Sequence, residues 1–179
     1  MKAINLFGYT GGTTMALAQR GAAVTHVDAA KSVVNWAREN AQQSNLADAP
    51  IRWIVEDAVR FLNREIKRGN RYDIVVADPP SFGRGPKNEV WKIQRDLDQL
   101  VSLFNQVTEG RCQMLILSCH TPEFTPERLR EVVMSEMSIV GGDHRAFQMS
   151  IPVSGDGNAT SKQKPNRLYS GSCFRWAKN

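Results

Sequence analysis

The 179-residue sequence has few cysteines and no long apolar run, and both absences narrow the class of protein. Its three cysteines, Cys112, Cys119 and Cys173, lie far apart and form no CxxC pair. This pattern argues against a disulfide framework and a cysteine-rich zinc site, and it fits a reducing cytosol. No stretch is long enough to span a bilayer, and no signal-peptide cleavage pattern follows Met1. We therefore expect a cytoplasmic protein without a metal site or a membrane anchor.

The charge and length of the chain set milder limits. A formal net charge of +5 and a pI near 9.3 favour a polyanionic partner, although such a charge is common on ordinary domains. At 179 residues and 41% hydrophobic content, the chain can bury one sizeable core. The sequence shows no internal repeat, and we expect a single domain over residues 1–179.

Strand-like and helix-like segments alternate from the first residues, which is typical of a mostly parallel sheet with helices on both faces. The pattern predicts strands at 3–6, 23–27, 51–55, 72–77 and 113–117, and helices at 13–20, 31–46, 58–68, 93–107 and 126–137. Two more strands, at 146–153 and 168–176, have no helix between them and predict an antiparallel hairpin at the sheet edge. The polar linker 154–166 is expected to be a disordered loop. The predicted fold is α/β, with a Rossmann-like sheet of seven strands.

The first turn between strand and helix, residues 7–14, is rich in glycine. Glycines let the chain turn sharply and let a ligand approach the main chain, while the following helix offers free N–H groups. Asp28 ends the second strand about 20 residues after Gly8, the spacing at which a carboxylate accepts hydrogen bonds from ribose hydroxyls. These features predict a ligand that contains a nucleoside, and a dinucleotide also fits them. Alternatively, Asp28 only caps the helix that begins at Lys31.

The run Asp78-Pro79-Pro80-Ser81-Phe82 follows the fourth strand, and strand ends carry sites in α/β proteins. Two consecutive prolines make a rigid elbow without backbone donors, so its carbonyls are expected to be free to accept from a ligand. A carboxylate and two carbonyls suit the amino group of a nucleobase, with Phe82 against the face of the base. The alternative is an ordinary tight turn. Asp57, after the third strand, can accept from an adenine amino group, cap the third helix, or do both.

Taken in order, these segments resemble the class I S-adenosylmethionine-dependent methyltransferases. The matching segments are 5–12, Asp28, Glu56-Asp57 and 78–82. The resemblance narrows to bacterial large-subunit ribosomal RNA (cytosine-C5) methyltransferases, which carry a similar Asn-Leu-Phe-Xaa-Tyr-Thr-Gly turn and Asp-Pro-Pro-Xaa-Phe elbow. It covers nearly the whole chain, including 82–87 and 172–176.

The resemblance implies S-adenosyl-L-methionine as cofactor and RNA, in particular ribosomal RNA, as substrate. It implies that the glycine turn holds the methionine part, Asp28 the ribose and Asp57 the adenine, with Asp78 where the methyl group meets its target. The expected cofactor-binding residues are Phe7, Gly8, Tyr9, Thr10, Gly11, Gly12, Asp28, Ala29, Asp57, Ala58 and Asp78. The expected catalytic residues are Asp78, Pro79, Pro80 and Cys119.

Cys119 follows the fifth strand, as a cysteine does in cytosine-C5 enzymes, whose thiolate attacks C6 of the base. A partly exposed thiol beside His120 is expected to have a lowered pKa. The alternative is a buried small residue. Ser81 replaces the cysteine that another group of these enzymes places after its proline pair. Either Cys119 acts alone or the target is a ring or exocyclic nitrogen, which needs no covalent adduct.

Basic and aromatic residues after the elbow are the expected RNA-binding residues, namely Phe82, Arg84, Lys87 and Trp91. The alternative is a solvated loop. Relatives carry a segment before the first strand, which we expect this sequence to lack, so a non-catalytic cofactor-binding module is a competing hypothesis. A nicotinamide-dependent oxidoreductase is a weaker one, because it leaves the proline elbow without a role. The oligomeric state is left open.

Overall fold

The computed structural model describes residues 1–85, 89–152 and 167–179. Its strands are β1 (Lys2–Leu6), β2 (Ala23–Asp28), β3 (Ile51–Val55), β4 (Ile74–Ala77), β5 (Phe82–Arg84), β6 (Val90–Lys92), β7 (Met114–Cys119), β8 (Asp143–Pro152) and β9 (Arg167–Ala177). Its helices are α1 (Gly12–Gln19), α2 (Lys31–Gln43), α3 (Ala58–Lys67), α4 (Ile93–Thr108) and α5 (Pro126–Glu136). The predicted strands of the main sheet and all five predicted helices are confirmed, with shifted ends.

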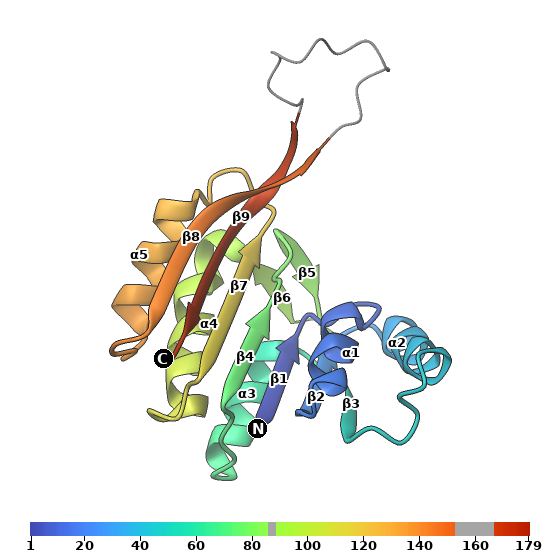
Figure 1. Cartoon of the computed structure of the whole chain (residues 1–179). Coiled ribbons are helices and arrows are strands. Elements are labelled where there is room, and N and C mark those ends of the chain that lie inside the picture. The colour runs from blue at the N-terminus through green and yellow to red at the C-terminus, as the bar shows by residue number, and fades with distance from the viewer. Residues whose placement is uncertain (86–88, 153–166) are drawn as a thin grey trace, which may run out of the picture.

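The main sheet has seven strands in the order β3-β2-β1-β4-β7-β9-β8, as Figure 1 shows. The first five are parallel, and the β8–β9 hairpin adds two antiparallel strands at the edge. The predicted α/β fold with an edge hairpin is therefore confirmed. Strand order reverses between β1 and β4, and in such sheets ligands bind at the carboxyl ends of the strands beside the reversal.

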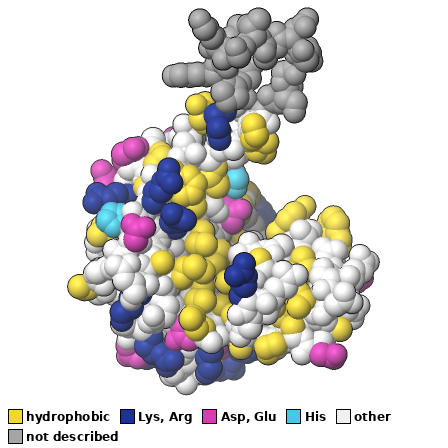
Figure 2. Space-filling model, viewed as in Figure 1, with side chains coloured by type: hydrophobic (Ala, Val, Ile, Leu, Met, Phe, Trp, Pro, Cys, Tyr) yellow, Lys and Arg dark blue, Asp and Glu magenta, His cyan; other side chains and the backbone are white. Residues whose placement is uncertain are grey.

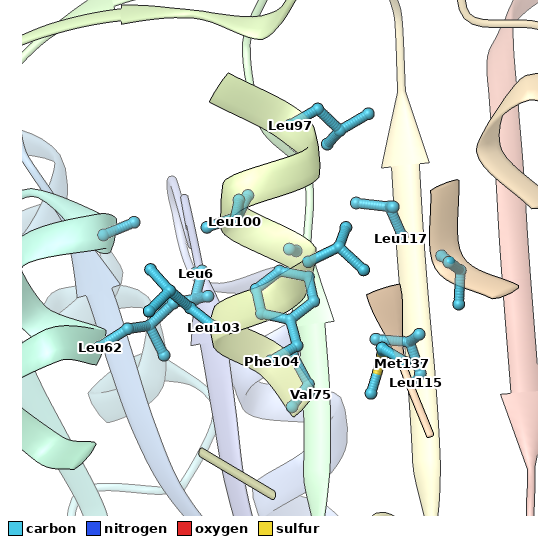
Figure 3. Close-up of a cluster of buried hydrophobic side chains, with 14 of the residues drawn as sticks. Leu6, Leu62, Val75, Leu97, Leu100, Leu103, Phe104, Leu115, Leu117 and Met137 are labelled. Carbon is cyan, nitrogen blue, oxygen red and sulfur yellow. The ribbon is translucent and has the colours of Figure 1, made fainter. Parts of the chain in front are cut away.

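Helices cover the two faces unequally. α1 and α2 lie on one face, and α3, α4 and α5 lie on the other (Figure 1). The larger core lies under α3–α5, where leucines, valines and aromatic rings fill the space between helix and sheet (Figure 3). In α4, Leu97, Leu100, Val101 and Phe104 recur at helical spacing and are fully buried. This packing holds the strand ends in fixed positions.

The opposite face carries a smaller apolar cluster. Ala3, Ile74 and Val76 pack there with Leu17 of α1. Figure 2 shows hydrophobic side chains in a stripe on this face, between α1 and the β8–β9 hairpin. In the described parts of the chain, no helix has both the length and the apolar character needed to cross a bilayer.

Two structural features were not predicted from the sequence. Residues expected to form a loop after the proline elbow instead pair as the antiparallel strands β5 and β6.

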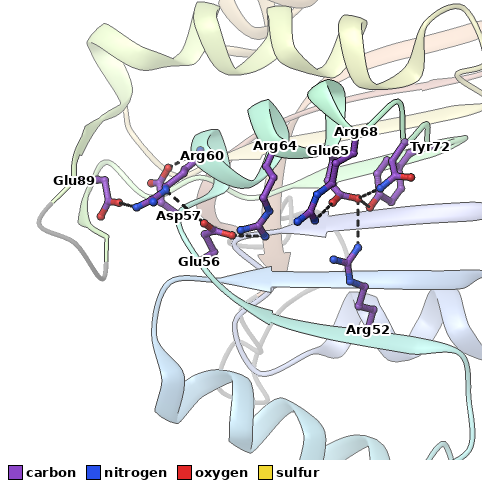
Figure 4. Close-up of polar contacts among 10 residues, drawn as sticks. Arg52, Glu56, Asp57, Arg60, Arg64, Glu65, Arg68, Tyr72 and Glu89 are labelled. Atoms are coloured by element: carbon purple, nitrogen blue, oxygen red, sulfur yellow. Dashed lines mark hydrogen bonds and ion pairs between the residues drawn. The ribbon is translucent and has the colours of Figure 1, made fainter.

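The second feature is a buried carboxylate. Glu65 on α3 accepts hydrogen bonds from Tyr72 and Asn70 and forms ion pairs with Arg52 and Arg68 (Figure 4). Burial raises the pKa of Glu65, but these donors outweigh it and lower the pKa overall. The predicted disordered linker 154–166 lies outside the described residues.

Candidate functional site

A cavity of about 500 Å³ opens at the carboxyl ends of the parallel strands, beside the strand-order reversal. One side, here called the β1–β3 side, is lined by Phe7, Tyr9, Val27, Asp28, Ala29, Ala30, Glu56, Asp57 and Ala58. The other, here called the β4–β7 side, is lined by Asp78, Pro79, Pro80, Gly83, Arg84, Gly85, Trp91 and His120. A cavity of this size suits a nucleoside-sized ligand. The structure thus brings most of the predicted cofactor residues together.

The glycine turn is held in an unusual backbone conformation. Phe7 and Tyr9 have positive φ angles of 55° and 46°, although neither is a glycine. Such residues are uncommon, and they cluster at functional sites. Gly11, with φ of 86°, is the N-cap of α1. The Thr10 carbonyl accepts a hydrogen bond from Asn40 at 3.0 Å. Phe7 and Tyr9 line the cavity, whereas Gly8, Thr10, Gly11 and Gly12 shape the turn behind them.

A buried histidine supports this turn from below. A Cβ added to Gly8 would come within 2.5 Å of the His26 ring, so this position requires glycine. His26 Nδ1 lies 2.8 Å from Thr14 Oγ1, which accepts a hydrogen bond from Asn5 at 2.9 Å. Burial lowers the pKa of His26 to about 4, with Asp28 opposing the shift. No role for His26 was predicted from the sequence, because this residue belongs to no recognisable motif with its neighbours along the chain.

Asp28 is fixed by backbone donors. Its Oδ2 accepts from the Tyr9 N–H and its Oδ1 from the Ala30 N–H, each at 3.0 Å. The alternative that Asp28 caps α2 is wrong, because Ala30 is the N-cap and that helix has no side-chain cap. Asp28 therefore links the glycine turn to the end of β2, while its carboxylate still lines the cavity.

Asp57 does cap a helix. Its Oδ1 accepts from the Arg60 N–H at 2.9 Å at the start of α3, which confirms the predicted capping role. Burial raises the pKa of Asp57, and nearby Glu89 and Glu56 add to this effect, while the Arg60 N–H opposes it. Glu56 forms ion pairs with Arg60 and Arg64 (Figure 4). A capping carboxylate can still accept a further hydrogen bond from a ligand in the cavity.

The proline elbow is tied to its surroundings by side chains. Asp78 Oδ1 accepts from Ser118 Oγ at 2.7 Å and lies 3.3 Å from His120 Nε2. Ser81 Oγ lies 2.6 Å from Thr121 Oγ1. The Pro80 carbonyl accepts from Trp91 Nε1 at 2.6 Å, so the expectation that both proline carbonyls are free is wrong for Pro80. Asp78, Pro79 and Pro80 all line the cavity, as predicted.

The predicted RNA-binding residues differ in their exposure and position. Phe82 is 52% exposed and is not part of the cavity lining, and the Arg84 guanidinium lies 5.9 Å from its ring centre. Trp91 is only 5% exposed, because alternation in β6 turns it inward against Phe7, yet it lines the cavity, and its role in stacking on a base stays a prediction. Lys87 lies outside the described residues.

Cys119 lies in the core rather than in the cavity. β7 continues two residues beyond its predicted end, so Leu115, Leu117 and Cys119 alternate onto the same buried face. The Cys119 side chain is 0% exposed. Burial raises the pKa of Cys119, although hydrogen bonds with Thr121 oppose the shift. The expectation of a partly exposed thiol with a lowered pKa is therefore wrong, and Cys112 and Cys173 are buried as well.

Some lining residues were missed. His120 was noted in the sequence without a definite role, yet it lines the cavity and contacts Asp78. Gly83 and Gly85 line the β4–β7 side. The alternating glycines of residues 82–85 were an available signal for close approach to a ligand.

Comparison with known proteins assigns the family. The model of a family described as Conserved hypothetical protein 95 matches residues 1–103. The chain belongs to this family. Its sheet topology and its similarity to a solved methyltransferase show a class I methyltransferase fold. A solved structure of a SAM-dependent methyltransferase from Agrobacterium tumefaciens matches 100% of the chain and 56% of that protein, with 35% identity and a TM-score of 0.90.

Curated relatives include ribosomal RNA methyltransferases. Ribosomal RNA large subunit methyltransferase K of Neisseria meningitidis is 33% identical over 100 residues, which is 55% of this chain and 28% of that protein. Methyltransferase K/L of Desulfotalea psychrophila is 36% identical over 104 residues, which is 57% of this chain and 14% of that protein. The chain thus spans less than a third of the length of these two relatives.

Proposed function

We propose that the chain is the catalytic domain of an S-adenosylmethionine-dependent methyltransferase, acting on a nitrogen of an RNA base, with ribosomal RNA as the favoured substrate. The observation that carries the proposal is the Asp78 carboxylate, which is half exposed in the lining of a nucleoside-sized cavity, with the exposed ring of Phe82 four residues further along the chain. The names of the similar proteins support both the cofactor and the RNA substrate.

In this proposal the β1–β3 side binds the cofactor. The glycine turn takes the methionine part, Asp28 accepts from the ribose hydroxyls, and Asp57 accepts from the adenine amino group. Each carboxylate lines the cavity and has a fixed orientation, because backbone N–H groups hold it. The sulfonium supplies a methyl group that is already activated, so the protein mainly has to orient donor and acceptor.

On the β4–β7 side, Asp78 accepts a hydrogen bond from the amino group of the target base, and Phe82 stacks on that base. A nitrogen acceptor is favoured over cytosine C5, because attack at C6 requires an accessible thiolate and Cys119 is buried with a raised pKa. A base within a duplex has to be flipped out to reach this point. Arg84, on the same side, is placed to contact the RNA backbone.

Transfer of labelled methyl groups to unmodified large-subunit ribosomal RNA, followed by nucleoside analysis, tests the proposal. We expect a nucleoside methylated on nitrogen. The Cys119→Ala variant is the matched comparison, because a nitrogen target leaves its turnover within about threefold of wild type, whereas a covalent route through C6 loses it. A C5-methylated product that disappears in Cys119→Ala contradicts the nitrogen assignment.

A cofactor-binding module that acts only with a partner is the second candidate, since the chain spans a small part of the curated relatives. Calorimetry with S-adenosylmethionine and with NAD separates the cofactor question from catalysis. Binding of S-adenosylmethionine without methyl transfer to any RNA favours the module. Binding of NAD alone favours an oxidoreductase and contradicts the proposal.

A further inference from the structure

Two protein side chains contact the same oxygen of the Asp78 carboxylate. Its Oδ1 accepts a hydrogen bond from Ser118 Oγ at 2.7 Å and lies 3.3 Å from Nε2 of His120. In the described residues, no side chain or backbone donor contacts Oδ2. One carboxylate oxygen is therefore committed to two protein groups, and the other remains for a ligand.

His120 is anchored on its opposite edge. Its Nδ1 lies within hydrogen-bond distance of the Ser170 carbonyl oxygen on β9. A carbonyl oxygen only accepts, so Nδ1 must carry a proton, and in the neutral ring Nε2 is then an unprotonated acceptor. The lone pair of Nε2 therefore faces Asp78 Oδ1. In this neutral form neither atom has a proton to share, and the space between them can hold one proton when it is supplied.

The backbone of β9 around Gly171 allows the contact between the Ser170 carbonyl and His120. Gly171 follows Ser170 with φ of 133°, and a Cβ there would overlap the Cys119 carbonyl oxygen and come within 3.0 Å of the His120 Cα. The register of β8 against β9 also shifts between Met149 and Ser150, beside Gly171. An incidental surface ion pair between Asp78 and His120 would not require β9 to approach His120 so closely. The position of the Ser170 carbonyl is thus a specific feature of the fold.

We infer that His120 is the proton acceptor of the proposed reaction and acts through Asp78. The inference rests on the proposed function. The lone pair of the base nitrogen forms the new N–C bond, the S–C bond breaks with its electrons on sulfur, and the cofactor becomes a thioether. The N–H proton is first held by the Asp78 carboxylate and is then taken by His120 Nε2, whose lone pair faces that carboxylate. The resulting imidazolium–carboxylate pair releases it to water, because both side chains are about half exposed, at 54% and 48%.

The tautomer can be tested without substrate. Long-range ¹H–¹⁵N spectra of the free protein report which ring nitrogen carries the proton in the neutral form, with the His120 signals assigned by their loss in His120→Gln. We expect the Nδ1–H tautomer, which free histidine disfavours. An Nε2–H tautomer for neutral His120 overturns the inference, since Nε2 then has no lone pair to receive the proton.

Turnover provides the second readout, measured at saturating cofactor on the RNA that the wild-type protein methylates. His120→Asn keeps a donor toward the Ser170 carbonyl and His120→Gln reaches toward Asp78, but neither side chain is a base. We expect both variants to lose about 10- to 100-fold in kcat, with KM for RNA within about threefold. Ser118→Ala, which removes the other partner of Oδ1 but no base, is the matched comparison and should lose less.

The outcomes separate the two proposals. If wild type methylates RNA and His120→Asn retains its kcat, His120 only holds the structure and the inference fails while the proposed function stands. If wild type binds the cofactor and methylates no RNA, the proposed function fails and the inference falls with it.

Discussion

The β1–β3 side and the β4–β7 side of the cavity hold their carboxylates by different means. Asp28 and Asp57 accept from backbone N–H groups of Tyr9, Ala30 and Arg60. Asp78 instead contacts a hydroxyl and an imidazole, both of which can exchange protons. A peptide N–H fixes an anion without taking part in its chemistry. This difference fits the proposal that the first side binds the cofactor and the second carries the reaction.

Removing the acceptor carboxylate is expected to have the largest effect. Asp78→Ala should lower kcat of methyl transfer by about 10²- to 10⁴-fold, because the variant can neither orient the target amino group nor pass its proton to His120. The Kd of S-adenosylmethionine, measured by calorimetry, should change by less than about threefold. Equal losses of turnover and cofactor affinity would erase the distinction between the two sides.

Removing a carboxylate on the β1–β3 side should instead weaken cofactor binding. Asp28→Ala removes the acceptor for the ribose and releases the Tyr9 N–H, so the Kd of S-adenosylmethionine should rise about 10- to 100-fold. Asp98→Ala on α4, an exposed carboxylate far from the cavity lining, is the control and should bind normally. Unchanged affinity in Asp28→Ala contradicts its role on the β1–β3 side.

The support beneath the glycine turn should be sensitive to acid. The pKa of His26 falls from 6.5 to about 4 on folding, so its contribution to stability is complete above pH 6.5 and is lost as pH falls toward 4. From this group alone, the free energy of unfolding should drop by about 2 kcal/mol between pH 8 and pH 5. Urea unfolding at both values measures the drop. His26→Asn, which cannot titrate, should reduce it, and an unchanged slope would show that other groups cause the acid sensitivity.

The smallest expected effect concerns the link between β6 and the elbow. Trp91→Phe keeps an aromatic ring against Phe7 but loses the hydrogen bond to the Pro80 carbonyl, so the protein should lose about 1 to 2 kcal/mol of stability. Trp36→Phe, at a 53% exposed position, should stay within about 0.5 kcal/mol of wild type in the same unfolding assay. Equal stability of both variants would make the Pro80 contact incidental.

The two sides also differ in what the sequence alone predicts. The glycine turn, Asp28 and Asp57 were found because each belongs to a contiguous strand and turn. On the β4–β7 side, Asp78 and Trp91 line the cavity, but the burial of Cys119 and of most of the Trp91 side chain was not predicted. Two extra residues of β7 moved Cys119 into the core, and the pairing of β5 with β6 buried Trp91. His120 acquires its anchor from Ser170, 50 residues away, which no local pattern reveals.

The contact between Gly8 and the His26 ring has a consequence for how the sequence can change. The space above His26 admits a hydrogen at position 8 and no methyl group. Gly8→Ala should therefore be tolerated only together with a smaller residue at position 26. We expect these two positions, one in the turn after β1 and the other within β2, to vary as a pair among related chains, so that their combined side-chain volume beneath the turn stays constant.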